Sequence, residues 1–240
     1  MFKITIPCYN CQDLILPCLN SIISQSYTDW EAVVVNDGSK DKTKEVLETI
    51  TDSRIKVIHN EINVGSPLAS IIAATKALNA NPEDVIINID ADDQLYCNDA
   101  FEYLVSVYSD PNILMTYGQF EPMSHSYHNY CKPIRDTETY RKSGYWYASH
   151  LRTYKKKIFD LINDNDLRDD DGQYYKMAGD AALLYPLIEL AGNGRVRFID
   201  KILYLYNDLS ELNEMKVNSS KQVGIANKVR SKSEYSRAKI

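Results

Sequence analysis

The stretch Val85-Ile86-Ile87-Asn88-Ile89-Asp90-Ala91-Asp92-Asp93 joins a short apolar run to three carboxylates within four positions. An apolar run of this length, bounded by polar residues, predicts a buried strand of a parallel sheet. The carboxylates then emerge at the carboxyl end of the strand, where open α/β sheets bind ligands. Crowded carboxylates repel one another unless a cation joins them, so the pattern indicates a divalent metal site. A helix with Asp92 or Asp93 as its N-cap explains the same residues without a metal.

The composition is that of an ordinary globular protein. The 240 residues are 44% hydrophobic and 25% charged, with a net charge of -6. This length is sufficient for one sizeable α/β domain or two small ones. The negative balance disfavours a nucleic-acid binder, which needs a basic face. No apolar run approaches the ~18 residues that span a bilayer. No signal peptide precedes the first strand, so a cytoplasmic location is expected.

Five cysteines are present, and Cys8 and Cys11 form a C-x-x-C pair. Such a pair is typical of zinc or redox sites, but no second pair of cysteines or histidines completes a zinc site. We therefore expect reduced, partly buried thiols in a reducing compartment.

Alternating elements fill the first half of the chain. Strands are expected at 2–6, 30–35, 54–59 and 85–89, and helices at 13–25, 41–50, 68–78 and 99–108. This alternation is typical of a doubly wound, mostly parallel sheet with helices on both faces. The second half predicts a strand at 113–120, a long loop at 121–147, partly helical structure at 149–163, a helix at 181–190 and strands at 195–200 and 202–206. The chain from 208 onward has the composition of a polar tail.

Four polar spots follow the strands or lie in the loops of the first half, and parallel strands bring such ends to one sheet edge. They are Tyr9-Asn10, Asp37-Gly38-Ser39, Asn63-Val64-Gly65 and the Asp90–Asp93 cluster. An aromatic ring stacks on a base, a lone carboxylate accepts a hydrogen bond from a base or ribose, and clustered carboxylates hold a cation that bridges phosphates. Singly, each spot also fits an ordinary turn or loop. Together they indicate a nucleotide site.

These residues resemble glycosyltransferase family 2, the inverting glycosyltransferases of GT-A fold. The resemblance lies in 4–10, 18–27, 33–43 and 90–93, the last being similar to the D-x-D metal motif, and the strand pair 198–206 resembles the closing hairpin of the family. It implies a single GT-A domain, Rossmann-like, at 1–207. The nucleotide-binding half would be 1–100 and the catalytic and acceptor half 101–207, followed by the tail at 208–240.

The resemblance implies a set of donor-site residues. On the base side are Pro7, Tyr9, Asp37 and Asn63, and on the metal side are Asp90, Ala91 and Asp92. Asp90 would lie near the ribose and help to hold Mn²⁺ or Mg²⁺, with Asp92 as the main ligand. Asp93 joins this set or caps the next helix. One departure is Ser70, which stands where the family often has an arginine that contacts the nucleotide.

Asp180 is the candidate catalytic base. The family usually has Glu-Asp at the start of a helix, and here Gly179-Asp180 opens an apolar run. Inverting transfer is a single displacement, so the acceptor hydroxyl needs one base, and a carboxylate suffices. An N-cap of the same helix is the structural alternative. Trp146 and His150 are candidates for contact with the acceptor or the diphosphate, with a purely structural role as the alternative for each.

The sequence therefore predicts a metal-assisted glycosyltransferase that uses a nucleoside-diphosphate sugar, with uridine diphosphate favoured, and a glycan, lipid or protein acceptor. Two other functions use the same residues: a sugar nucleotidyltransferase and a non-catalytic module that binds sugar nucleotides. The first would need a glycine-rich loop with arginine and lysine after the first strand, and Cys8-Tyr9-Asn10-Cys11 is not one.

Overall fold

A computed structural model gives the structure of residues 1–126, 130–209 and 219–240. Within these residues, one eight-stranded sheet has the order β3-β2-β1-β4-β7-β6-β8-β5. Strands β1 to β4 are parallel, β7 is antiparallel to β4 and β6, and β8 is parallel to β6. The strands are β1 (Phe2–Cys8), β2 (Trp30–Asn36), β3 (Ile55–His59), β4 (Val85–Asn88), β5 (Gln94–Leu95), β6 (Met115–Pro122), β7 (Arg152–Lys155) and β8 (Val196–Tyr206).

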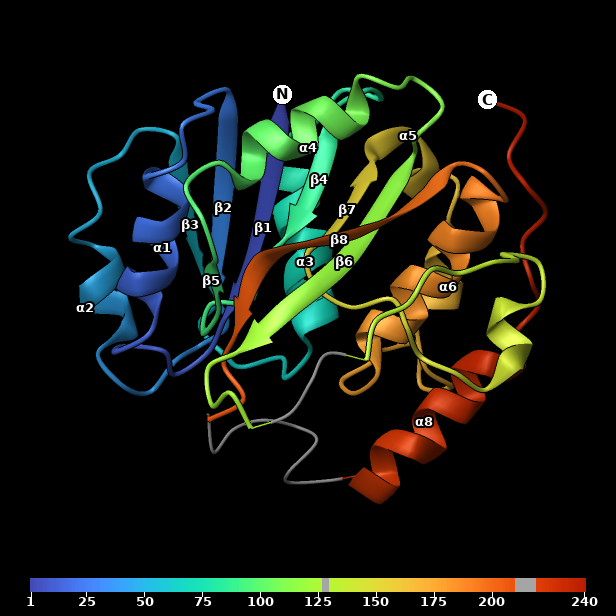
Figure 1. The fold of residues 1–240 in the computed structure, drawn as a ribbon. Helices are drawn as coiled ribbons and strands as arrows, with labels where there is room; N and C mark the ends of the chain where they lie inside the picture. Colours follow the sequence, from blue (N-terminus) through green and yellow to red (C-terminus); the bar gives the residue numbers. More distant parts are fainter. Residues whose placement is uncertain (127–129, 210–218) are drawn as a thin grey trace.

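Helices cover both faces of this sheet (Figure 1), which confirms the predicted α/β architecture. On one face α1 and α4 pack against Ile87, and on the other α3 and α6 pack against Ile86. Successive strand residues point to opposite faces, so the unbroken apolar run of β4 fills both layers. The helices are α1 (Ile15–Ile23), α2 (Thr43–Leu47), α3 (Pro67–Ala77), α4 (Ala100–Tyr108), α5 (Lys156–Phe159), α6 (Gly179–Ala191) and α8 (Ser219–Ser231), with 3-10 turns at Tyr140–Ser143 and Asp164–Leu167.

Two parts of the second half differ from the prediction. Residues 149–163 are helical in part, as predicted, at 156–159, but 152–155 form the strand β7, which was not expected. The partners of β7 are distant in sequence, so no local pattern marks this strand. The expected hairpin at 195–206 is wrong, because Val196–Tyr206 form one continuous strand, β8. The register of β8 shifts on either side of Gln119, and this irregularity accounts for the break in the apolar pattern.

Cys8 and Cys11 form a disulfide, so the expectation of free thiols is wrong for this pair. Strand β1 continues through Pro7 to Cys8, and Cys11 precedes α1. The turn between them leaves their Cα atoms 6.4 Å apart, a distance that a disulfide can span. The other three cysteines carry free thiols. The disulfide therefore closes the loop that carries Tyr9.

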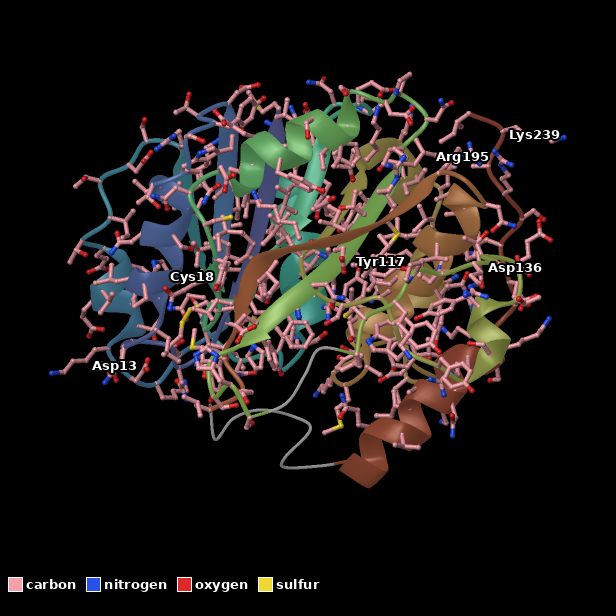
Figure 2. The ribbon with its side chains drawn as sticks, viewed as in Figure 1. Asp13, Cys18, Tyr117, Asp136, Arg195 and Lys239 are labelled. Atoms are coloured by element: carbon pink, nitrogen blue, oxygen red, sulfur yellow. A yellow bond between two sulfur atoms is a disulfide. The ribbon has the colours of Figure 1, made fainter. Side chains whose placement is uncertain are left out.

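The described part of the C-terminal tail packs against α6. Helix α8 buries Val229 in the same layer as α6, and the N–H of Ala238 donates to the carbonyl of Leu190. Figure 2 shows Arg195 beside the C-terminal segment, where its Nη2 donates to the carbonyl of Ala238 at 2.9 Å. Residues 219–240 therefore help to hold α6 in place. None of the helices in the described ranges is long and apolar enough to cross a membrane.

Candidate functional site

A tight turn follows β4 at the carboxyl edge of the parallel strands. The N–H of Ile89 still donates to the carbonyl of Thr5 at 3.1 Å, as in the sheet. The N–H of Asp90 then donates to the Tyr204 hydroxyl at 3.1 Å, and the N–H of Asp93 donates to the carbonyl of Asp90 at 3.0 Å. This turn brings the carboxylates of the D-x-D stretch out between β4 and β8.

Asp90, Asp93 and His150 meet at this turn. One ligand atom of each lies within 4.8 Å of those of the other two, and His150 Nε2 lies 3.3 Å from Asp90 Oδ2. Asp93 Oδ1 accepts the N–H of Asn207 at 2.6 Å. Asp93 Oδ2 and His150 Nε2 are buried, and neither makes a hydrogen bond of good geometry among the described residues, although Tyr204 adjoins Asp93 and Asp90 adjoins His150. Buried polar atoms of this kind call for a ligand, and two carboxylates with one imidazole fit a cation such as Mn²⁺.

The electrostatics of this group favour cation binding. Burial and the charge of Arg152 lower the pKa of His150, so its imidazole is neutral at pH 7, the form that ligates metals. Burial alone would raise the pKa of Asp90, but His150 and Arg152 outweigh it and lower that pKa. Burial, followed by the charges of Asp92 and Asp90, raises the pKa of Asp93 well above its usual value. The turn thus holds more negative groups than its protein neighbours can neutralise.

Asp92 lies outside the three-residue group, although the sequence assigns it to the metal. Burial and the charge of Asp90 raise the pKa of Asp92 to about 6. Its role as a ligand stays a prediction. The capping alternative is wrong for both Asp92 and Asp93, because the N-cap position of α4 is occupied by Asp99.

The loops after β1 and β2 and the loop before α3 are joined by hydrogen bonds. The N–H of Asn10 donates to Ser39 Oγ at 2.9 Å. The carboxylate of Asp37, which is 5% exposed, accepts N–H groups of Val64 at 3.1 Å and Gly65 at 3.0 Å. Three of the predicted polar spots therefore come together.

Asp37 and Tyr9 differ in how far they are available to a ligand. The carboxylate of Asp37 also accepts the Asn60 side-chain amide at 2.7 Å, so it organises the loop before α3. The Tyr9 ring stays 41% exposed beside the disulfide. Contacts of Pro7, Tyr9, Asp37 and Asn63 with a base stay predictions.

Asp180 lies in the first turn of α6, two positions after its N-cap residue Ala178, so it is not the N-cap. Its Oδ1 accepts the N–H of Ala181 at 2.8 Å, and its Oδ2 lies 3.5 Å from Arg152 Nη2. Arg152 opens β7 and pairs with Asn88 of β4. Arg152 thus connects the candidate base to the edge that carries Asp90.

The sequence analysis missed three residues of this site: Arg152, Tyr204 and Asn207. The Tyr204 ring stacks on His150 with centroids 4.7 Å apart. The sequence carries no local signal for Arg152, because β7 begins at this residue and its strand partners are distant in sequence.

Trp146 is half-buried and packs edge-on against Tyr185 of α6, with ring centroids 5.5 Å apart. This contact is the purely structural role that the sequence analysis gave as the alternative for Trp146. A role of Trp146 in acceptor binding stays a prediction.

Comparison of the sequence with known proteins identifies related enzymes. The chain is 31% identical over 121 residues to the UDP-Glc:alpha-D-GlcNAc-diphosphoundecaprenol beta-1,3-glucosyltransferase WfgD of Escherichia coli, a match covering 50% of this chain and 46% of that protein. It is 35% identical over 115 residues to the glycosyltransferase GlyA of Streptococcus pneumoniae, a match covering 45% of this chain and 16% of that protein. The matches thus span less than half the length of these relatives.

Solved structures share the fold. TarS 1-349 of S. aureus in complex with UDP-GlcNAc superposes with a TM-score of 0.66 at 20% identity, covering 90% of this chain and 60% of that one. The mannosyltransferase PcManGT from Pyrobaculum calidifontis, in complex with GDP-Man and Mn²⁺, superposes with a TM-score of 0.65 at 17% identity. This match covers 98% of this chain and 65% of that one. At such identities the likeness shows the fold alone, and it confirms the GT-A prediction.

The membership follows from the sequence profile of one family. The profile described as Glycosyl transferase family 2 matches residues 3–171, well over half of the chain. This range includes β1 from its second residue onward, the D-x-D turn and β7. The chain therefore belongs to glycosyl transferase family 2.

Proposed function

We propose that this chain transfers a sugar from a nucleoside-diphosphate sugar to an acceptor hydroxyl with inversion, assisted by a divalent metal and with Asp180 as general base. The observation that carries the proposal is the meeting of Asp90, Asp93 and His150 at the carboxyl edge of the sheet. The same edge carries the joined loops around Tyr9 and Asp37. Family membership supports the class of reaction.

Asp90, Asp93 and His150 would hold the metal, with Asp92 as the further ligand expected from the sequence. Mn²⁺ or Mg²⁺ bound there would neutralise negative charge that develops on the leaving nucleoside diphosphate. The neutral imidazole of His150 and the ionised carboxylate of Asp90 are the protonation states that a cation requires.

Asp180 would accept the proton of the acceptor hydroxyl as its oxygen attacks the anomeric carbon. The bond between that carbon and the diphosphate breaks, and its electron pair goes to the phosphate oxygen. The contact of Asp180 Oδ1 with the N–H of Ala181 fixes the carboxylate. Oδ2 then faces Arg152 and the donor edge.

Uridine diphosphate is the proposed nucleotide, with Pro7, Tyr9, Asp37 and Asn63 around the base and Asp90 and Ala91 toward the ribose. The UDP-linked sugars in the names of the E. coli relative and the TarS complex support this choice. The GDP-Man of the PcManGT complex makes guanosine diphosphate the natural comparison.

The proposed acceptor is a glycan, lipid or protein, reached through the side of the site near Trp146 and His150. A lipid-linked sugar is the first class to test, because the E. coli relative is named for one. The cytoplasmic location stays a prediction.

The proposal is tested by combining donor binding with turnover. Thermal unfolding is followed with UDP-Glc, UDP-GlcNAc and GDP-Man, each with and without Mn²⁺, since a bound donor stabilises the folded state by mass action. Release of the nucleoside diphosphate is then measured for the wild type, Asp180→Asn and the exposed control Asp13→Asn. We expect donor binding in all three and a loss of turnover of about 10²–10⁴-fold in Asp180→Asn alone.

Three outcomes contradict the proposal. If no donor stabilises the protein with Mn²⁺, there is no donor site. If the wild type binds a donor but never turns it over with lipid-linked, glycan or protein acceptors, the chain is a binding module. If it releases pyrophosphate from a nucleoside triphosphate and a sugar phosphate, it is a nucleotidyltransferase.

A further inference from the structure

Arg152 occupies a central position that the assignments above leave without a function. It pairs in register with Asn88, two residues before Asp90, and its side chain is 12% exposed. Burial opposes its charge, but the carboxylates of Asp180 and Asp90 raise the pKa of Arg152 overall. A permanent cation therefore stands between the candidate base and the carboxylates of the D-x-D turn.

The guanidinium of Arg152 has more donors than the described residues satisfy. It carries five N–H groups. Its Nε is buried and has no hydrogen-bond partner in the described part of the chain, and Nη2 makes only a long contact of 3.5 Å with Asp180. A contrast is Arg141, whose Nε and Nη2 donate to both carboxylate oxygens of Glu189 at 2.6 and 2.7 Å. The guanidinium of Arg141 forms a complete bidentate ion pair with Glu189, whereas that of Arg152 forms no such pair with Asp180.

We propose that Arg152 binds the terminal phosphate of the donor diphosphate and stabilises it as the leaving group; this rests on the proposed function. A guanidinium presents parallel N–H groups that match two phosphate oxygens. The chemistry needs no proton from Arg152, which stays protonated. The electron pair of the broken bond goes to the phosphate oxygen, and Arg152 donates hydrogen bonds to the charge that forms there.

The rival role is purely structural, in which Arg152 only balances Asp180 and Asp90. The two roles differ in what a substitution does to ligands of different length. A phosphate-binding arginine distinguishes UDP from UMP, because only UDP carries the terminal phosphate. A merely structural arginine affects both nucleotides alike, since both depend on the same loops around Tyr9 and Asp37.

The test is calorimetric titration of UDP and UMP, with Mn²⁺ present, into the wild type, Arg152→Gln and Arg152→Lys. Arg197→Gln is the matched control, because Arg197 is 54% exposed on β8 and its ion-pair contact is a 3.9 Å approach to Asp110. We expect Arg152→Gln to weaken UDP binding about 10- to 100-fold, as for loss of a charge-assisted hydrogen bond, with UMP affinity within about twofold. Arg152→Lys should restore part of the loss, and Arg197→Gln should bind as the wild type.

Arg152→Gln removes one charge and leaves Asp180 without its partner, which could destabilise the folded protein. The double variant Arg152→Gln with Asp180→Asn is therefore titrated as well. It removes both charges of the pair and should stay folded with the same selective loss of UDP binding. Parallel losses for UDP and UMP, or no loss for either, overturn the role of Arg152. If the wild type binds UDP and Arg152→Gln loses UDP binding selectively, but the wild type transfers no sugar, the diphosphate site stands and the transferase proposal falls. If the wild type binds neither nucleotide, both fall.

Discussion

The Nε2 atom of His150 lies 3.3 Å from Oδ2 of Asp90, and the imidazole ring lies flat against Tyr204. This stacking fixes the ring plane, and the buried Nε2 faces a carboxylate without completing a hydrogen bond in the described part of the chain. A side chain held in this way is prepared for a ligand that the two residues share.

Removing either Asp93 or His150 should abolish stabilisation by Mn²⁺. In the wild type, Mn²⁺ at about 100 times its dissociation constant should raise the free energy of unfolding by about 2.7 kcal/mol. Asp93→Asn and His150→Gln should lose most of this gain, whereas Asp13→Asn should keep it because Asp13 is exposed. Thermal unfolding with a Mn²⁺ titration measures the effect. Full Mn²⁺ stabilisation in both variants would rule out this ligand set.

Asp92→Asn should stabilise the metal-free protein at neutral pH. The pKa of Asp92 is raised to about 6 in the folded state, from an ordinary value of 3.8. The folded state therefore binds the proton more tightly than the unfolded chain, and ionisation of Asp92 costs stability as pH rises from about 4 to about 6. The shift of about 2 units corresponds to at most about 3 kcal/mol.

Denaturant unfolding of the wild type and Asp92→Asn across pH measures this effect. The difference between them should vanish near pH 4 and be complete above pH 6. If Asp92 is also a metal ligand, as the sequence predicts, the wild type should be more stable than Asp92→Asn in the presence of Mn²⁺ at pH 7.5. A variant that is no more stable than the wild type in metal-free buffer at pH 7.5 would contradict the expected repulsion.

Gly38→Ala should disturb the loop that encloses Asp37. Gly38 has a φ of +67°, and a Cβ there would lie 2.6 Å from the backbone nitrogen of Asn63. Gly172 has a similar φ of +72° with nothing within 4 Å, so Gly172→Ala isolates the backbone cost. We expect Gly172→Ala to lower the free energy of unfolding by about 1–2 kcal/mol and Gly38→Ala to lower it by about 3 kcal/mol or more. Gly38→Ala should also weaken nucleotide binding. If both variants lose the same free energy of unfolding, the backbone at Asn63 moves away from the new Cβ without cost, and the expected clash is contradicted.

The Cys8–Cys11 disulfide should protect two of the five thiols. Alkylation of the denatured, unreduced protein should add three groups, and five after reduction, as counted by mass spectrometry. Replacing both residues by serine should lower the free energy of unfolding by about 2 kcal/mol, since the closed loop is short. Cys97→Ser serves as control because Cys97 carries a free thiol. Five groups added before reduction would show that the pair is reduced.

The first half of the fold could be predicted because its information is local. Strands β1 to β4 and the helices up to α4 each have their own apolar pattern, and short connections impose parallel order. The two-residue strand β5 was not predicted, because it pairs with the distant β8. The carboxylates of Asp90 to Asp93 follow β4 directly in sequence, so their position at the sheet edge needed no long-range contact.

The rest of the site depends on pairs that are distant in sequence. Arg152 reaches Asn88 only through the antiparallel pairing of β7, and Tyr204 reaches His150 only because β8 lies beside β6. The pattern around Arg152 precedes three lysines and resembles a helix start, so strand pairing decided its conformation. The disulfide was missed because a C-x-x-C spacing alone does not give the geometry of the turn.

Strand β8 ties the chain around the Asp90–Asp93 turn to the chain near residue 200. It pairs with β5, which follows the D-x-D turn directly, and the residue just after it, Asn207, donates its N–H to Asp93. The edge that carries Asp93 is therefore built by residues 114 positions apart. A chimera that exchanges the chain after residue 100 would bring a foreign β8 to the edge that carries Asp93. A graft of acceptor specificity should instead keep 150–155, Asp180 and 196–207 native, because His150, β7 and β8 all adjoin the edge that carries Asp90.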